Sequence, residues 1–169
     1  SGTDNDIYAQ CINSSGMVQW AANGVEIWTE PNIQYYPTII SDSSGGAIIT
    51  WEDYRSGNAN IYAQRINSLG ATQWAANGVA ICTATNGQYF PTIISNDSGG
   101  AIITWNDVRS GNNDIYAQGI NASGVVQWAI DGVAICTAAN YQSNPITTSD
   151  GSGGAIITWE DNRSGNANI

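Results

Sequence analysis

Basic residues are scarce in this sequence. Lysine and histidine are absent, and 4 arginines against 14 acidic residues leave a formal net charge of −10. Such a surface repels nucleic-acid phosphates and anionic lipid headgroups, so we expect neither nucleic acid nor a membrane as a partner. Acid–base and nucleophilic catalysis often depend on histidine or lysine, so their absence argues against an enzyme.

Long apolar runs are missing as well. No stretch approaches the ~18 apolar residues that a membrane helix needs, and no signal-peptide pattern opens the chain. The abundant residues indicate a folded protein, because 42% are hydrophobic and seven are tryptophan. The 19 glycines, often beside Asn, Asp or Ser, predict many tight turns.

An internal repeat of 54 residues is the strongest signal in the sequence. Trp51, Trp105 and Trp159 keep this spacing. Further residues keep the same period: Trp20, Trp74, Trp128, Pro37, Pro91 and Pro145. Self-similarity at such a fixed period predicts a solenoid, a propeller or an array of units.

Each unit is predicted to contain four β-strands. In the unit that begins near residue 89, the first three strands run over 91–95, 101–105 and 115–118. The last strand runs from 125 to 128 and on through 133–136. Short β-branched and aromatic runs between Gly, Asn, Asp and Ser turns are typical of strands and hairpins, and no segment has a useful helical period. Pairs such as Ile102-Ile103 indicate strands that are buried on both faces.

These features predict an all-β fold of β-propeller blades, each with four antiparallel strands, in three 54-residue repeats. The expected division is a half-blade at 1–34, blades at 35–88 and 89–142, and a half-blade at 143–169. Three blades are too few to close a ring, since propellers usually have about 4–8. We therefore expect the ring to be completed by a longer chain or by oligomerisation, as a six- or nine-bladed ring. A filament is the other form of self-association.

The cysteines do not form a disulfide framework, because there are three of them, an odd number. Cys82 and Cys136 hold the repeat position of Trp28. A position that accepts cysteine or tryptophan indicates a buried apolar slot rather than a redox or metal site. Cys11 shares its position with the arginine and glycine at 65 and 119, and this variety predicts an exposed position.

Two motifs resemble known propeller repeats. The turn at 41–46, sequence SDSSGG, is followed by Thr50 and Trp51, recurs in each unit and resembles the Asp-box of sialidase-type propellers. This resemblance implies a structural turn whose side-chain oxygens accept hydrogen bonds from turn amides. The stretch Trp-(Glu/Asn)-Asp-x-Arg-Ser-Gly-Asn, ending in Ile-Tyr-Ala-Gln, is similar to repeats of secreted bacterial propellers and, more distantly, to TolB-type blades. An extracellular location follows from this resemblance alone.

The second motif places an aspartate and an arginine two residues apart at a predicted strand end. Its repetition favours a structural ion pair, within a unit or with the next one, over a catalytic carboxylate, because a catalytic site is normally built once. With the repeated tryptophans, these residues form the expected structural set: Trp51, Trp105, Trp159, Asp53, Arg55, Asp107, Arg109, Asp161 and Arg163.

No cofactor or metal is expected, with calcium as the one alternative. Acidic and amide side chains cluster in two loops: Asp4, Asn5, Asp6, Asn112, Asn113 and Asp114. Calcium prefers several oxygen ligands from one loop. These clusters lack the alternation of a calcium-binding loop, and turn formation explains the same residue types.

Aromatic residues provide the ligand-binding hypothesis. They precede the innermost strand of each unit, where loops would surround one face of a propeller, and the candidates are Tyr35, Tyr36, Tyr89, Phe90 and Tyr141. Aromatic faces beside amide side chains suit stacking on sugar rings. Packing between blades is the competing interpretation, and we favour it for the repeated tryptophans.

Two functions are therefore considered. The first is a non-catalytic, extracellular propeller that acts as a structural, assembly or adhesion scaffold and has further copies of itself as partners. The alternative is a multivalent lectin with one weak glycan site per blade or blade junction, strengthened by avidity. A sialidase-like enzyme needs several arginines at one site, which three repeat-equivalent arginines do not readily supply.

Overall fold

The computed structural model describes residues 5–29 and 31–165, and its regular elements there are all β-strands. Their bounds are β1 Ile7–Ala9, β2 Val25–Trp28, β3 Gln34–Ser41, β4 Ala47–Asp53, β5 Asn60–Ile66, β6 Val79–Cys82, β7 Gln88–Ser95, β8 Ala101–Asp107, β9 Asp114–Ile120, β10 Val133–Cys136, β11 Gln142–Ser149 and β12 Ala155–Asp161. Over these described ranges, the chain forms no apolar helix of membrane-spanning length.

The strands form separate antiparallel sheets that follow the repeat. One four-stranded sheet has the order β3-β4-β5-β6, and a second has the order β7-β8-β9-β10. Two-stranded sheets, β1-β2 and β11-β12, lie on either side of them. By the 54-residue period, β1-β2 correspond to β5-β6, and β11-β12 correspond to β3-β4. The predicted all-β, antiparallel fold is confirmed.

The first two strands of each unit are longer than predicted. β7 starts at Gln88 rather than Pro91, and β8 continues to Asp107 rather than ending at Trp105. The ladder between the two strands includes the pair Gln88 and Asp107, so polar residues extend it beyond the apolar run. Apolar patterning therefore underestimated the strand length.

The predicted strand at 125–128 is wrong. Val126 forms only an isolated bridge with Ile120, and the regular strand is β10 alone. The Oδ1 atom of Asn121 accepts hydrogen bonds from the amides of Ser123 and Val125, both at 3.0 Å. The amide of Gly132 donates to the carbonyl of Ala129 at 2.9 Å, so a second turn separates this bridge from β10 and interrupts the fourth strand.

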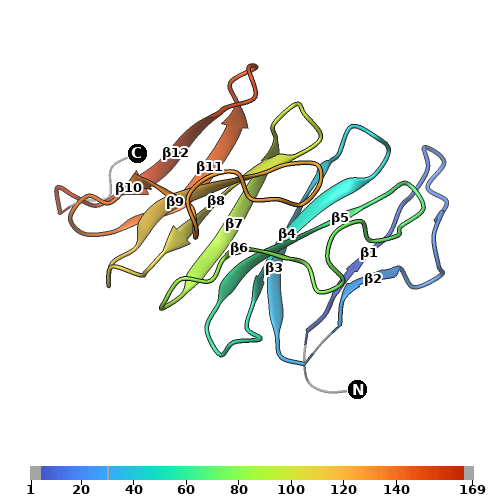
Figure 1. Cartoon of the computed structure of the whole chain (residues 1–169), viewed down its shortest axis with the longest axis horizontal. Helices are drawn as coiled ribbons and strands as arrows, with labels where there is room; N and C mark the ends of the chain where they lie inside the picture. Colours follow the sequence, from blue (N-terminus) through green and yellow to red (C-terminus); the bar gives the residue numbers. More distant parts are fainter. Residues whose placement is uncertain (1–4, 30, 166–169) are drawn as a thin grey trace.

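The sheets lie side by side in chain order, face against face (Figure 1). The first strands of three successive sheets, β3, β7 and β11, pack against one another. An apolar cluster between the two four-stranded sheets contains Ile48, Ile93 and Trp105. A second cluster, toward β1 and β2, contains Ile27 and Trp51. The core is therefore divided into layers between the sheets.

A second set of tryptophans connects each unit to the following one. The indole Nε1 of Trp20 donates to the carbonyl of Ser68, and that of Trp74 donates to the carbonyl of Ala122, both at 3.0 Å. Gly124 allows this close approach, because a Cβ atom there would lie 2.7 Å from the Trp74 ring. The same contact thus recurs at successive junctions.

Main-chain hydrogen bonds also cross between units. The first residues of β3, β7 and β11 donate their amides to carbonyls just before β1, β5 and β9 of the preceding sheets at 2.8–2.9 Å. The donor and acceptor pairs are Gln34 with Asn5, Gln88 with Ala59, and Gln142 with Asn113. Each unit therefore docks on its neighbour in the same way.

The position shared by Cys11, Arg65 and Gly119 is not exposed, contrary to the prediction. Cys11 and Arg65 are partly buried, and Gly119 is buried. The Arg65 guanidinium forms a salt bridge of 2.8 Å with Asp42, while the ring of Trp128 covers Gly119. Different side chains fill this site with different partners, and sequence variety alone did not reveal that.

Candidate functional site

A β-bulge interrupts the first strand of three successive sheets, next to a proline. Strand pairing changes register there in β3, β7 and β11. The residues before the prolines are Tyr36, Phe90 and Asn144, with φ of 51°, 54° and 55°. Residues other than glycine rarely adopt such angles, and bulges redirect side chains, often at functional sites. These three side chains therefore depart from the regular strand alternation.

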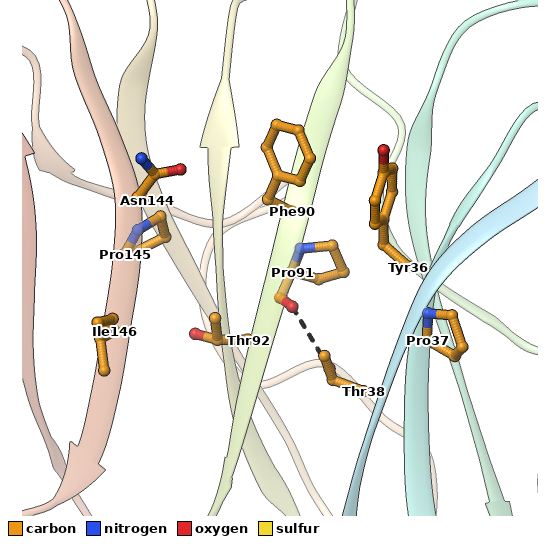
Figure 2. Close-up of a pocket in the computed structure, with 9 residues that line it drawn as sticks. All are labelled: Tyr36, Pro37, Thr38, Phe90, Pro91, Thr92, Asn144, Pro145 and Ile146. Carbon is orange, nitrogen blue, oxygen red and sulfur yellow. Dashed lines mark hydrogen bonds between the residues drawn. The ribbon is translucent and has the colours of Figure 1, made fainter.

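The bulges border an open groove of about 340 Å³ that crosses β3, β7 and β11. Each strand contributes the bulged residue, its proline and the next residue: Tyr36, Pro37, Thr38, Phe90, Pro91, Thr92, Asn144, Pro145 and Ile146. Figure 2 shows Phe90 between Tyr36 and Asn144, with the three prolines in a row beside them. The lining is mainly apolar.

The threonine hydroxyls at the groove bond to the protein itself. The Oγ1 atom of Thr92 lies 2.6 Å from that of Thr104 and 3.1 Å from that of Thr147. The hydroxyl of Thr38 donates to the carbonyl of Pro91 at 3.4 Å. The polar groups of two strands are thus partly engaged before any ligand arrives.

Four of the predicted ligand-binding aromatics gather where β3 meets β7. The ring centroids are 5.9 Å apart for Tyr35 and Tyr36, 5.0 Å for Tyr36 and Phe90, and 6.3 Å for Tyr89 and Phe90. These residues lie within β3 and β7, not in loops before the strands. The strands already start at the preceding glutamines, which places the aromatics on the sheet.

Tyr141 lies apart from this group. It holds the repeat position of Ile33 and Gly87, immediately before β11, and it makes no aromatic ring contact among the described residues. In its unit the positions of Tyr35 and Tyr36 are taken by a serine and an asparagine, at 143 and 144. The structure therefore groups the aromatics at one junction.

Two residues of this junction, Glu52 and Tyr54, were missed by sequence reasoning. Glu52 is 0% exposed, and its Oε1 accepts a hydrogen bond of 2.7 Å from the amide of Phe90 in the next unit. Its Oε2 accepts one of 3.2 Å from the Tyr54 hydroxyl. The Tyr54 ring meets Tyr35 edge-on at 5.9 Å. The sequence feature that could have indicated Tyr54 is that the other units have no tyrosine at its repeat position.

The environment of this junction changes its acid–base properties. Burial raises the pKa of Glu52, and the hydrogen bonds from the Phe90 amide and the Tyr54 hydroxyl offset this only in part. Burial, together with the negative charge of Glu52, raises the pKa of Tyr54 to about 12. Ionisation of the carboxyl is therefore less favourable in the folded chain than in the unfolded one.

We expect Glu52→Gln to raise the melting temperature at pH 8 and to leave it nearly unchanged at pH 4. A carboxyl whose pKa is raised by folding binds its proton more tightly in the folded state, so stability falls as the pH rises through both pKa values. Glutamine keeps an acceptor for the Phe90 amide and carries no charge. Thermal unfolding at the two pH values measures the difference, with Glu160→Gln as an exposed control at the same repeat position. A lower melting temperature at pH 8 would contradict the prediction.

The Trp-x-Asp-x-Arg motif forms the same contacts in each unit. The indole Nε1 of Trp51 donates to Asp53 at 3.0 Å, and Arg55 forms an ion pair with Asp53 at 2.6 Å. The other two units repeat both contacts: Trp105 and Arg109 with Asp107 at 2.8 and 2.6 Å, and Trp159 and Arg163 with Asp161. The ion pairs lie within units.

The arginines of this motif also contact the preceding sheet. The guanidinium of Arg55 lies 3.9 Å from the ring centroid of Trp28, and Arg109 donates to the Cys82 sulfur at 3.2 Å. Burial raises the pKa of the Cys82 thiol to about 12. The last junction repeats the arrangement with Cys136, which is only partly buried. The position of Trp28, Cys82 and Cys136, which was predicted to be an apolar slot, therefore lies next to an arginine side chain.

The Asp-box-like turn is held by its own side chain. The Oδ1 atom of Asp42 accepts hydrogen bonds from the amides of Ser44 and Gly46, both at 2.8 Å. Burial acts to raise the pKa of Asp42, but these hydrogen bonds and the contact with Arg65 outweigh it and lower the pKa. The carboxylate is thus committed to the turn and to one ion pair.

The loops considered for calcium make contacts within the protein. Asp114 accepts a hydrogen bond of 2.7 Å from Ser110, and the carbonyls of Asn5 and Asn113 accept amides from the next unit. No three His, Cys, Asp or Glu side chains converge as metal ligands in the described ranges. Asp4 lies outside those ranges. Calcium stays the untested alternative to the expectation that no metal is bound.

The groove beside Tyr36 and Phe90, backed by Glu52, is the candidate functional site, because bulged backbone, exposed rings and a buried carboxylate coincide there. Two repeated motifs resemble repeats of known propellers. Membership of the propeller family that this resemblance implies stays a prediction. No protein-family model matches the chain, and no curated protein or solved structure is significantly similar to it.

Proposed function

We propose that the chain is a non-catalytic, extracellular scaffold whose sheets are blades of a β-propeller and whose copies associate through the outer sheets. Four-stranded antiparallel sheets in sequential order, stacked with their first strands together, support the blade assignment. The acidic residues of the repeated motif are held in ion pairs, which supports a structural role. The extracellular location is based on the resemblance to secreted repeats.

The contrast between covered and uncovered sheet faces carries this proposal. Ile48 and Ile102 are 0% and 3% exposed, whereas Ile156, at the same repeat position in β12, is 61% exposed. On the opposite face, Ile93 is 8% exposed and its equivalent in β3, Ile39, is 59% exposed. Ile48 and Ile93 belong to one cluster between neighbouring sheets. The uncovered faces at Ile156 and Ile39 therefore resemble the two sides of the interface between the four-stranded sheets, which supports association of copies through them.

The two-stranded sheets also match each other, because together they contain the equivalents of the four strands of one complete sheet. β12 corresponds to β4 and β1 corresponds to β5, and β4 pairs with β5 from end to end. We therefore expect β12 of one copy to pair with β1 of another copy in this register. Open strand edges and exposed apolar faces favour such pairing. Contacts of this head-to-tail kind close into a ring or extend into a filament.

Light scattering tests the proposed association. We expect a solution mass that is at least twice the 17.8 kDa of one chain. Ile156→Asp should return the mass toward that of one chain, because it places a charge on the docking face. Leu69→Asp changes an 81% exposed turn residue and should leave the mass unchanged. A wild-type chain that stays monomeric would overturn the proposal.

The multivalent lectin stays a prediction. It requires comparable sites along the array, one per unit or junction. The exposed pair of Tyr36 and Phe90 occurs at one junction, and Asn144 holds the third equivalent position of the groove. The scaffold is therefore the better supported function.

A further inference from the structure

The junction between β4 and β7 differs from the one that follows it. It contains Glu52 and Tyr54, and the equivalent residues in the next unit are Asn106 and Val108. The Glu52 carboxylate reaches across to the amide of Phe90, whereas the buried Oδ1 of Asn106 accepts no hydrogen bond from the described protein atoms. Two of the differences between these near-identical units therefore lie beside the exposed rings.

Two aromatic rings at this junction are open to solvent. Tyr36 is 55% exposed and Phe90 is 45% exposed, and their planes meet at 63°. Figure 2 shows both rings beyond the prolines of their strands, with the Tyr36 hydroxyl directed away from Pro37. The faces of aromatic rings carry partial negative charge and attract cations within about 6 Å.

The carboxylate of Glu52 contacts the Phe90 backbone and, among the residues that the structure describes, has no basic partner. Its hydrogen-bond donors, the Phe90 amide and the Tyr54 hydroxyl, are both neutral. The four arginines of the chain pair with other carboxylates: Arg55 with Asp53, Arg65 with Asp42, Arg109 with Asp107, and Arg163 with Asp161. No described arginine forms an ion pair with Glu52, and its carboxylate lies 2.7 Å from the amide of the groove residue Phe90.

We propose that Tyr36, Phe90 and Glu52 form a binding site for a small organic cation with a quaternary ammonium group. The ring faces contact the alkylated ammonium, and the carboxylate attracts it through a partly apolar medium.

Other ligand classes fit this site less well. A metal ion requires several oxygen ligands, and the groove is lined mainly by carbon. The net charge of −10 disfavours anions. A neutral sugar depends on free polar groups beside the rings, and the hydroxyls of Thr38 and Thr92 already bond to the protein.

Calorimetric titration with choline at pH 8 and low salt tests the site directly. The neutral isostere 3,3-dimethylbutan-1-ol has the same shape without the charge, and cellobiose serves as the saccharide probe. We expect choline to bind about tenfold more tightly than the isostere, the ratio expected for two exposed cation–π contacts. Cellobiose should show no binding.

Matched variants assign the binding to these residues. Tyr36→Leu and Glu52→Gln should each weaken choline binding several-fold, whereas Phe90→Tyr should retain it because the ring remains. Tyr141→Leu is the control, since Tyr141 is also 55% exposed but lies outside the cluster. A melting curve of each variant is needed to check that the chain is folded during the titration.

Three results would overturn the proposal. Equal affinity for choline and its isostere would mean that the groove binds apolar ligands without regard to charge. Binding of cellobiose but not choline would identify a saccharide site. A Tyr141→Leu variant that weakens choline binding as much as Tyr36→Leu does would show non-specific association. None of these results depends on the oligomeric state, so this site and the scaffold proposal fail or hold separately.

Discussion

We expect Trp105→Ala to lower the free energy of unfolding by about 3–5 kcal/mol, the loss typical of truncating a fully buried aromatic side chain. The Trp105 side chain is 0% exposed and stacks on Tyr116 with ring centroids 6.4 Å apart. Gly132 packs so closely that a Cβ atom there would lie 2.6 Å from the indole ring. The cavity left by alanine therefore removes contacts on several sides. Urea denaturation followed by fluorescence measures this loss.

Trp128→Ala is the control for this experiment, because Trp128 is 41% exposed. Its removal should cost much less, since solvent already contacts the ring. Equal losses for the two variants would contradict the layered core. A Trp105→Ala variant that unfolds like the wild type but no longer binds ligand would instead show that the repeated tryptophans act in binding.

Asp107→Asn is expected to destabilise the fold by about 3 kcal/mol, because it leaves the charge of Arg109 without its partner in a largely buried site. Asp107 is 0% exposed. Its carboxylate accepts hydrogen bonds from the Trp105 indole at 2.8 Å and from the Arg109 guanidinium at 2.6 and 2.8 Å. An asparagine side chain has one acceptor oxygen, and its NH₂ group would face donors. Urea denaturation at neutral pH gives the change.

Asp161→Asn provides the matched control at the same repeat position. The Arg163 side chain is 53% exposed, against 22% for Arg109, so water can solvate the charge that loses its partner. A clearly smaller loss is expected. Equal losses would indicate that the ion pair contributes through local turn geometry and not through burial.

The repeat and the strands were predictable because they depend on local patterns. Tryptophans and prolines at a fixed spacing indicated the unit, and the run from Val133 to Cys136 marked β10 with its observed bounds. The stretch at 125–128 resembled a strand for the same local reason, but the turn from Ala129 to Gly132 separates it from β10. An apolar pattern alone does not show where such a turn interrupts a strand.

The candidate site was only partly predictable from the sequence. Its aromatic residues were predicted to bind a ligand because they stand beside amide side chains before the innermost strand of each unit. The sequence did not indicate the positive φ of Tyr36 and Phe90, because glycine and asparagine are the usual residues at such angles. The contact between Glu52 and Phe90 joins residues of different sheets, so the spacing within one unit could not reveal it.

The tryptophan contacts between units explain how the repeats can change in sequence and still fit together. Trp20 and Trp74 donate to the carbonyls of Ser68 and Ala122, and a carbonyl is present whatever the side chain. The residue that provides the carbonyl can therefore be replaced without loss of the hydrogen bond between units. Duplicated units remain compatible with their neighbours as they diverge, and one junction is free to acquire residues for a separate task.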